Sequence, residues 1–285
     1  MITSYEETNE NLYEIFLGVR DKLFAEIINT ENTEIIEGIT KFLEMENEHL
    51  FKAETVRLLE PDQKTLSLSK FYTGRVDITK TGYAVEGYID EILDRVDYIG
   101  KIVGEGFDTV AELGGGWGLN LFLLSKLIGK SGPRLILAKY TETGRKLCEK
   151  FEGLRGAPKL QKVFVDHRNL DLSFINETRK LLIFTCHSVE QIDHIPKDYF
   201  QKICAAADEV VGLHLEPVGF QLMPDDDVRK KCRENFTREK RYNLNFFETI
   251  KAAETSNILT IRNIEIERFA SQPENPTSII VWDKC

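Results

Sequence analysis

The chain has 285 residues, of which 42% are apolar and 29% charged, a composition typical of a soluble globular protein with one large domain or a domain and a smaller lobe. Its formal net charge of −10 argues against a general nucleic-acid binder, because neutralising phosphates requires clustered Lys and Arg. No apolar run approaches the roughly 20 residues that span a bilayer, and the acidic start of the chain is unlike a signal or transit peptide, so we expect no membrane partner.

Cysteine usage bears on the compartment and on metals. The count of five is odd, and no two cysteines have the C-x-x-C spacing. This pattern argues against a disulfide framework and against a structural zinc site. We therefore expect a cytoplasmic protein without a bound metal.

Residues 1–104 show helical periodicity, and we expect at most minor strand content there. Apolar stripes at helical spacing run through residues 12–27, 35–43 and 88–103. The irregular stretch from Pro61 to Gly87 separates the last two stripes and contains Tyr72 and Arg75. We predict that residues 1–104 form a helical N-terminal lobe that caps the pocket of an acceptor molecule, with Tyr72 and Arg75 binding that substrate.

From Asp108 the chain alternates between β-rich runs and helical or turn-rich segments. The first five runs cover Thr109–Leu113, Arg134–Tyr140, Leu160–Val165, Lys180–Cys186 and Glu209–Leu215. Such alternation predicts a parallel sheet with right-handed crossovers.

The C-terminal part differs from this alternation. Two further β-rich runs, Ile258–Phe269 and Thr277–Asp283, are joined by the turn-rich segment SQPENP. They predict a hairpin that ends the sheet with an antiparallel strand. Residues 105–285 are therefore predicted to form an α/β, Rossmann-like domain around a seven-stranded, mostly parallel sheet.

The strongest local signal is the segment DTVAELGGGWGLNLFLL, which starts at Asp108. A β-rich run leads to Glu112, then Gly114, Gly116 and Gly118 stand at alternate positions, and an amphipathic helix follows. Glycines permit a sharp turn and let a ligand touch the backbone. Free N–H groups at the start of the helix suit a carboxylate, and the negative charge of Glu112 suits an amino group.

Two rival ligand-binding patterns fail on this segment. The dinucleotide fingerprint G-x-G-x-x-G/A requires a small residue at its sixth position. That position holds Leu119 when counted from Gly114 and Leu121 when counted from Gly116. The G-K-[ST] ending of a P-loop is also absent. The segment therefore favours neither NAD nor a nucleoside triphosphate.

The glycine segment and the order of elements from Asp108 to Cys285 resemble the class I S-adenosylmethionine (SAM)-dependent methyltransferases. The resemblance implies that SAM is the cofactor and that it is bound by Glu112, Gly114, Gly116 and Gly118.

At the ends of its second and third strands this family has residues that contact the ribose and the adenine. The family places an acid that binds the ribose hydroxyls at the end of its second strand. Here Lys139 stands at that position, and Glu142 is the nearest carboxylate and our candidate for the ribose. Asp166, after the third strand, corresponds to the residue that contacts adenine, and Cys186 is a further candidate beside the cofactor.

Three pieces of the chain, ELGGGWG, CHSVEQI and HLEPVGFQ, resemble more narrowly the sugar O-methyltransferases of bacterial surface-polysaccharide loci. This likeness implies methyl transfer to a hydroxyl of a sugar or another small metabolite. Peptide and small-molecule N-methyltransferases share the first piece, so an amine or guanidine acceptor stays open. A SAM-binding partner protein without catalysis is the third hypothesis. The oligomeric state is left open.

Ligands of open α/β sheets bind at the carboxyl ends of the strands. A hydroxyl acceptor must lose a proton, and a histidine with a pKa near neutrality suits that task. We predict that His187, at the end of the fourth strand, is the general base. His214 and Glu216 share one face of the fifth strand by its period of two and are predicted as a second catalytic pair.

Glu190 follows His187 by three residues and is predicted to bind the substrate. The spacing of His187, Glu190 and His194 is also compatible with metal ligands on a helix. No supporting carboxylate pattern stands elsewhere in the chain, so we expect no metal at this position.

Overall fold

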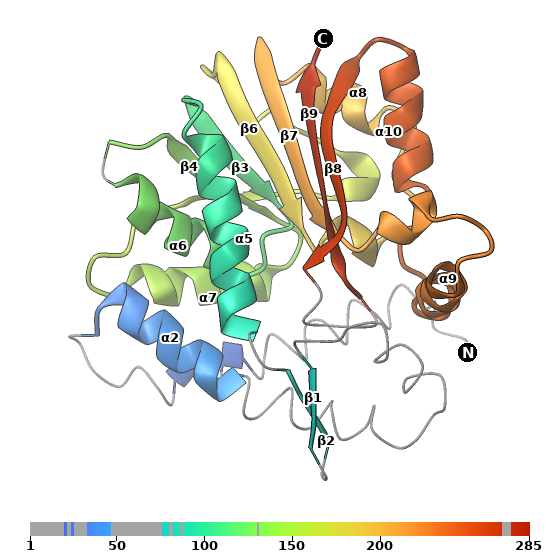
Figure 1. The fold of residues 1–285 in the computed structure, drawn as a ribbon. Helices are drawn as coiled ribbons and strands as arrows, with labels where there is room; N and C mark the ends of the chain where they lie inside the picture. Colours follow the sequence, from blue (N-terminus) through green and yellow to red (C-terminus); the bar gives the residue numbers. More distant parts are fainter. Residues whose placement is uncertain are drawn as a thin grey trace, which may run out of the picture.

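The computed structural model describes residues 20–21, 24–25, 33–46, 76–79, 82–85, 88–129, 131–269 and 275–285. The predicted substrate residues Tyr72 and Arg75 and most of the apolar stripe at 12–27 lie outside these ranges. The N-terminal part contributes helix α2 (Ile35–Glu46) and helix α5 (Tyr88–Val103). Between them a small antiparallel hairpin pairs β1 (Val76–Thr79) with β2 (Gly82–Val85) (Figure 1).

A seven-stranded sheet forms the centre of the fold and confirms the predicted α/β class (Figure 1). Its strands in chain order are β3 (Thr109–Leu113), β4 (Arg134–Lys139), β5 (Gln161–Phe164), β6 (Lys180–Cys186), β7 (Glu209–Glu216), β8 (Leu259–Phe269) and β9 (Thr277–Lys284). Their spatial order is β5-β4-β3-β6-β7-β9-β8. After β3, the strands β4 and β5 are added on one side of it, and the next strand, β6, is added on the other side. β3 and β6 are therefore neighbours, and their carboxyl ends form a topological switch point.

The hairpin of β8 and β9 differs in one respect from the prediction. Only β9 runs antiparallel, and it lies between β7 and β8 instead of at the edge of the sheet. β8 forms the edge strand of the sheet, and β9, which follows it in the chain, lies inside the sheet between β8 and β7. As a result, β7 has a hydrogen-bonded neighbour on both sides.

Helices cover both faces of the sheet. One buried cluster joins side chains of α2, α5, α6 (Leu119–Ile128) and α7 (Glu142–Glu152) to one face of the sheet. A second cluster joins α8 (Tyr199–Cys204) and α10 (Phe246–Thr255) to the other face. Helix α9 (Val228–Lys240) contacts the 3-10 turn Gly219–Leu222, and Figure 1 shows it below α10. No helix in the described ranges is both long and apolar enough to cross a membrane.

Helices α2 and α5 belong to the same buried cluster as the sheet. Phe42 of α2 contacts Trp117 of the glycine segment edge to face, with ring centroids 5.3 Å apart. Ile92 and Ile99 of α5 are fully buried in this cluster. The predicted division between residues 104 and 105 stays a prediction, and these contacts tie both sides of it to one core.

Trp282 of β9 packs over the backbone of β7 and supplies the first testable prediction. A Cβ atom on Gly212 would overlap the indole ring of Trp282, which is fully buried. We expect Gly212→Ala to lower the free energy of unfolding by about 1–3 kcal/mol, the usual cost of overpacking a core. Denaturant titration measures the loss.

A double-mutant cycle isolates the clash. In a Trp282→Leu background the ring is gone, so adding Gly212→Ala should cost clearly less than it does in the parent protein. An equal cost in both backgrounds would mean that the glycine is needed for some reason other than room for the indole.

Candidate functional site

The glycine turn joins β3 to α6 through backbone conformations that only glycine adopts easily. Gly114, Gly116 and Gly118 have φ values of 77°, 58° and 93°. The amide of Gly114 donates a hydrogen bond to the carbonyl of Ala138, at 2.7 Å, which fixes the start of the turn on β4. No described atom lies within 4 Å of where a Cβ atom on Gly116 would stand. The turn therefore exposes bare backbone to open space at Gly116.

Trp117 anchors this turn. Its ring stacks on Phe151 of α7, with centroids 4.1 Å apart and an angle of 18°, and it is almost fully buried. The side chain points into the core while the flanking glycines pass the chain over it. The turn is thus held rigidly, which suits a preformed binding site.

Glu112, the last but one residue of β3, is buried beneath the turn. Its Oε1 accepts a hydrogen bond of 2.6 Å from Nδ2 of Asn120, and its carboxyl group occupies the space that a Cβ atom on Gly115 would need. Oε2 is buried without a hydrogen-bond partner among the described residues. Burial raises the pKa of Glu112 to about 7, although Asn120 and the charge of Lys139 oppose the shift. A cation placed nearby would stabilise the charged form of this carboxyl group.

The end of β4 departs from the family pattern in the structure as it does in the sequence. Lys139 is buried, and its aliphatic stem fills the space above Gly144. Glu142 begins α7, its side chain is 59% exposed, and it pairs with Arg145, which lowers its pKa. Thr141 lies between them, and its buried Oγ1 has no hydrogen-bond partner among the described residues. Thr141 is thus a polar group at this end that the sequence did not single out.

Asp166 follows β5 and accepts a hydrogen bond from the amide of Arg168, which caps a short 3-10 helix over His167–Asn169. His167 is buried, and its Nδ1 lies 2.9 Å from the hydroxyl of Tyr199. Burial lowers the pKa of His167 to about 4, so its ring is neutral near pH 7. Asp166 therefore has a local capping role, and its predicted contact with adenine stays a prediction.

The loop after β6 lies directly against the glycine turn. Ser188 donates a hydrogen bond of 2.8 Å to the carbonyl of Leu113, and its Cβ would collide with a side chain at Gly114. The predicted cofactor residues of β3 and the predicted base His187 are therefore brought to one place, at the carboxyl ends of β3 and β6.

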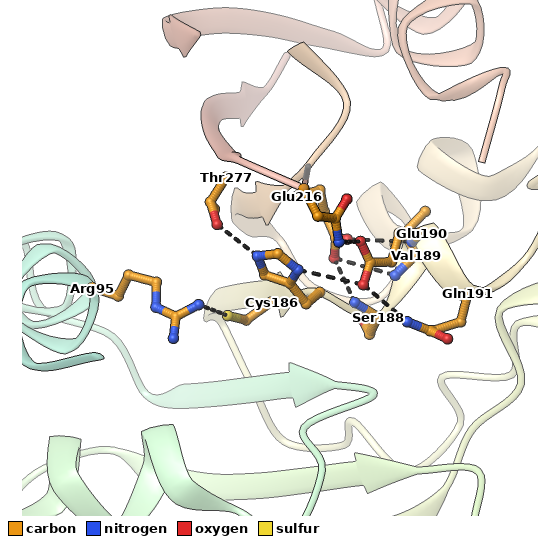
Figure 2. A network of polar contacts seen from close by, with 10 residues as sticks. Arg95, Cys186, Ser188, Val189, Glu190, Gln191, Glu216 and Thr277 are labelled. Atoms are coloured by element: carbon orange, nitrogen blue, oxygen red, sulfur yellow. Dashed lines mark hydrogen bonds and ion pairs between the residues drawn. The ribbon is translucent and has the colours of Figure 1, made fainter. Parts of the chain in front are cut away.

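Glu216, the last residue of β7, organises this loop. It is fully buried, and its two oxygens accept hydrogen bonds from the backbone amides of Ser188, Val189 and Glu190, at 3.1, 3.2 and 3.3 Å (Figure 2). Burial raises the pKa of Glu216 to about 7. Because its oxygens are taken by backbone amides, the geometry favours a structural role for Glu216 over the predicted catalytic one.

His187 stands at the start of the loop with an unusual backbone. Its φ of 50° lies in the left-handed region, which is strained for residues other than glycine, and such strain concentrates at functional sites. The ring lies 2.6 Å from the hydroxyl of Thr277 through Nε2 and 3.3 Å from Oε1 of Glu190 through Nδ1. The side chain is 22% exposed, so a ligand can reach it.

The charge state of His187 depends on its neighbours. Burial by itself would lower the pKa of His187, but the charge and the hydrogen bond of Glu190 outweigh it. The pKa is therefore raised above its ordinary value of 6.5. Figure 2 shows Glu190 beside the ring and Thr277 on its other side, with Arg95 reaching from α5 toward Cys186.

His214 does not reach this site. It is fully buried between Thr185, 2.9 Å from Nδ1, and Trp282, whose indole N–H donates to Nε2 at 2.9 Å. Burial lowers the pKa of His214 to about 3. Since the ring of His214 is completely enclosed in the core, whereas that of His187 is partly exposed, the structure does not favour the predicted catalytic role of His214.

Cys186 and His194 complete the predicted set. Cys186 ends β6 with its Sγ 3.8 Å from a guanidinium nitrogen of Arg95, and burial raises its pKa to about 12, so it is a neutral thiol beside the turn. His194 is 61% exposed and pairs with Asp193. Residues Val189–Gln191 form a 3-10 turn, so His187, Glu190 and His194 do not share a helix.

Sequence reasoning missed Asn120 and Thr277. Asn120 is a polar residue within the apolar helix LNLFLL, and that anomaly was a usable signal. Thr277 opens β9 and lies 90 positions from His187, so no local pattern connects the two.

Comparisons with known proteins give distant likenesses. No family model matches the chain, and no curated protein matches its sequence. Among solved structures, the N-terminal domain of EvdMO1, crystallised in the presence of S-adenosylhomocysteine (SAH) and D-fucose, is 12% identical, with 79% of this chain and 97% of that chain covered and a TM-score of 0.43.

Two other solved structures match at a similar level. The plantazolicin methyltransferase BpumL, in complex with a monoazolic desmethylPZN analogue and SAH, is 12% identical, with coverages of 78% and 90% and a TM-score of 0.42. The PH0226 protein from Pyrococcus horikoshii OT3 is 13% identical, with coverages of 77% and 99% and a TM-score of 0.45. At this distance the likeness concerns the fold alone.

Proposed function

We propose that the protein is a SAM-dependent methyltransferase that acts on a hydroxyl group of a sugar or another small metabolite. The observation that carries the proposal is the glycine turn, which offers bare backbone at Gly116 and meets the loop of His187 where Ser188 lies against Gly114. SAH in the crystals of EvdMO1 and BpumL agrees with this cofactor.

The residues at the turn fit the methionine end of SAM. The first amides of α6 face the turn and suit the carboxylate. Glu112, buried with an unpartnered Oε2, suits the positively charged amino group. At the ribose end, the buried hydroxyl of Thr141 lies closer to the end of β4 than Glu142 does, and Lys139 stands where the family has its acid. A ribose held without a carboxylate is therefore part of the proposal.

SAM supplies a methyl group on a sulfonium, an excellent leaving group. The protein then has to align the acceptor and take its proton, because a neutral hydroxyl is a poor nucleophile. In the proposed mechanism His187 accepts that proton while Glu216 holds the backbone of the loop in place. The exposed part of the His187 ring defines the side on which the acceptor binds.

Calorimetry tests the cofactor. SAH should bind and NAD should not, because the turn lacks the dinucleotide fingerprint. The same titration at pH 6 and pH 8 should show tighter SAH binding at pH 8, since the pKa of Glu112 is about 7 and its charged form attracts the ammonium group.

Two results would contradict the proposed cofactor. One is NAD binding without SAH binding. The other is SAH binding that weakens from pH 6 to pH 8. A screen of methyl transfer to sugars, amines and peptides then separates the acceptor classes, and transfer to amines alone would favour N-methylation.

A further inference from the structure

We propose that Glu190 is the positioning residue of the His187 base: its carboxylate accepts a hydrogen bond from Nδ1–H of the ring and leaves Nε2 as the basic atom. This inference rests on the proposed function for its catalytic meaning, but the pairing itself is a property of the described contacts. The sequence analysis predicted that Glu190 binds the substrate, whereas in the structure its carboxylate lies next to Nδ1 of His187.

The neighbours of the His187 ring determine which of its nitrogens carries the proton. A carboxylate only accepts hydrogen bonds. Because Oε1 of Glu190 lies 3.3 Å from Nδ1, a neutral His187 ring carries its proton on Nδ1. Nε2 then holds the lone pair and accepts a hydrogen bond of 2.6 Å from the hydroxyl of Thr277. In the structure the basic atom of the ring, Nε2, therefore points toward the hydroxyl of Thr277.

The side chain of Glu190 is held firmly by its neighbours. It is 4% exposed. Its Oε1 also accepts from Nε2 of Gln191 at 2.9 Å, and its Oε2 accepts from Nδ2 of Asn275 at 2.8 Å (Figure 2 shows the Gln191 contact). The Glu190 carboxylate cannot rotate without breaking several hydrogen bonds, so it holds the His187 ring in one orientation. The carboxylate of a nucleophile–base–carboxylate triad orients its histidine in the same way.

Glu216 is the other carboxylate near His187. Glu216 faces His187 from β7, but its oxygens are engaged by three backbone amides. The charged groups that act on His187 are thus Glu190 from the same loop, Glu216 from β7 and Arg95 from α5, which opposes protonation. Glu190 is the one whose carboxylate forms a hydrogen bond, 3.3 Å long, with Nδ1 of the ring.

The strained backbone supports the same assignment. His187 sits at a φ of 50°, a left-handed conformation that is unfavourable for most L-residues. The hydrogen bonds to Glu190 and Thr277 compensate for that cost, and together they direct the ring.

The test is a titration of the His187 ring by NMR in the wild-type protein and in Glu190→Gln, without cofactor or acceptor. Glutamine keeps the shape but not the charge, so the midpoint of His187 should fall by about one unit or more. Glu190→Asp, which keeps the charge on a shorter side chain, should fall less and serves if the glutamine variant does not fold. Asp193→Asn removes a charge from the same loop without contacting His187 and should leave the midpoint unchanged.

Turnover supplies the second readout. The acidic limb of the pH–rate profile should move to lower pH in Glu190→Gln together with the ring midpoint, a shift that a purely structural role would not produce. An unchanged ring midpoint overturns the proposal. A ring midpoint that shifts while the pH–rate profile stays fixed overturns it too, because Glu190 would then partner a histidine that is not the base. Since the ring titration needs no cofactor, it decides the pairing even if SAH does not bind.

Discussion

Gly116→Val is expected to abolish SAH binding while the protein stays folded. The branched side chain would enter the open space next to the turn, where no described atom lies within 4 Å of the Cβ position. Because a Cβ atom at this position would displace no described atom, the expected cost to the fold is that of the left-handed backbone, roughly 1–2 kcal/mol for an L-residue. Calorimetry measures the binding, and thermal unfolding measures the fold.

Gly106 offers a matched control for this substitution. It also has a positive φ, 82°, and open space around its Cβ position, but it lies before β3, at the amino end of the strands. Gly106→Val carries the same backbone penalty and should leave SAH affinity unchanged. If both variants bind SAH like the wild type, the ligand does not contact Gly116, and the cofactor site must be sought elsewhere.

Much of the fold follows from apolar patterning, and the glycine turn follows from residue identity. The runs Thr109–Leu113 and Lys180–Cys186 are mostly apolar, and the structure places them as strands in the middle of the sheet, with the predicted bounds. Glycines at alternate positions after a buried strand indicate a tight turn, and Gly114, Gly116 and Gly118 each have a positive φ in the structure. Local chemistry was sufficient for these parts.

The roles of His214 and Glu216 required tertiary information. Period-two alternation correctly puts them on one face of β7, but it does not say what covers that face. Because β9 inserts next to β7, Trp282 reaches His214 and encloses it in the core. Glu216 is turned toward backbone amides of a loop that begins 29 residues earlier, at His187. Contacts between segments so far apart leave no periodic trace in the sequence.

Loss of the His187 ring is the other change with a large expected effect. A positioned general base typically contributes about 10²–10⁴-fold, so His187→Ala should lower kcat for a hydroxyl acceptor by that factor and leave SAH affinity nearly intact. His187→Asn is the more careful variant, because asparagine tolerates the positive φ at this position and keeps the loop in shape without supplying a base.

A second histidine in the same region provides the control for this experiment. His194 is exposed and pairs only with Asp193 among the described residues, so His194→Ala should leave turnover unchanged. An equally large loss of SAH binding in both His187 variants would assign His187 to the cofactor pocket instead of to proton transfer. Turnover close to wild type in His187→Asn would remove His187 from the mechanism. It would also favour an amine acceptor, because an uncharged amine attacks a sulfonium methyl group without a strong base, and no buried general base would then be required.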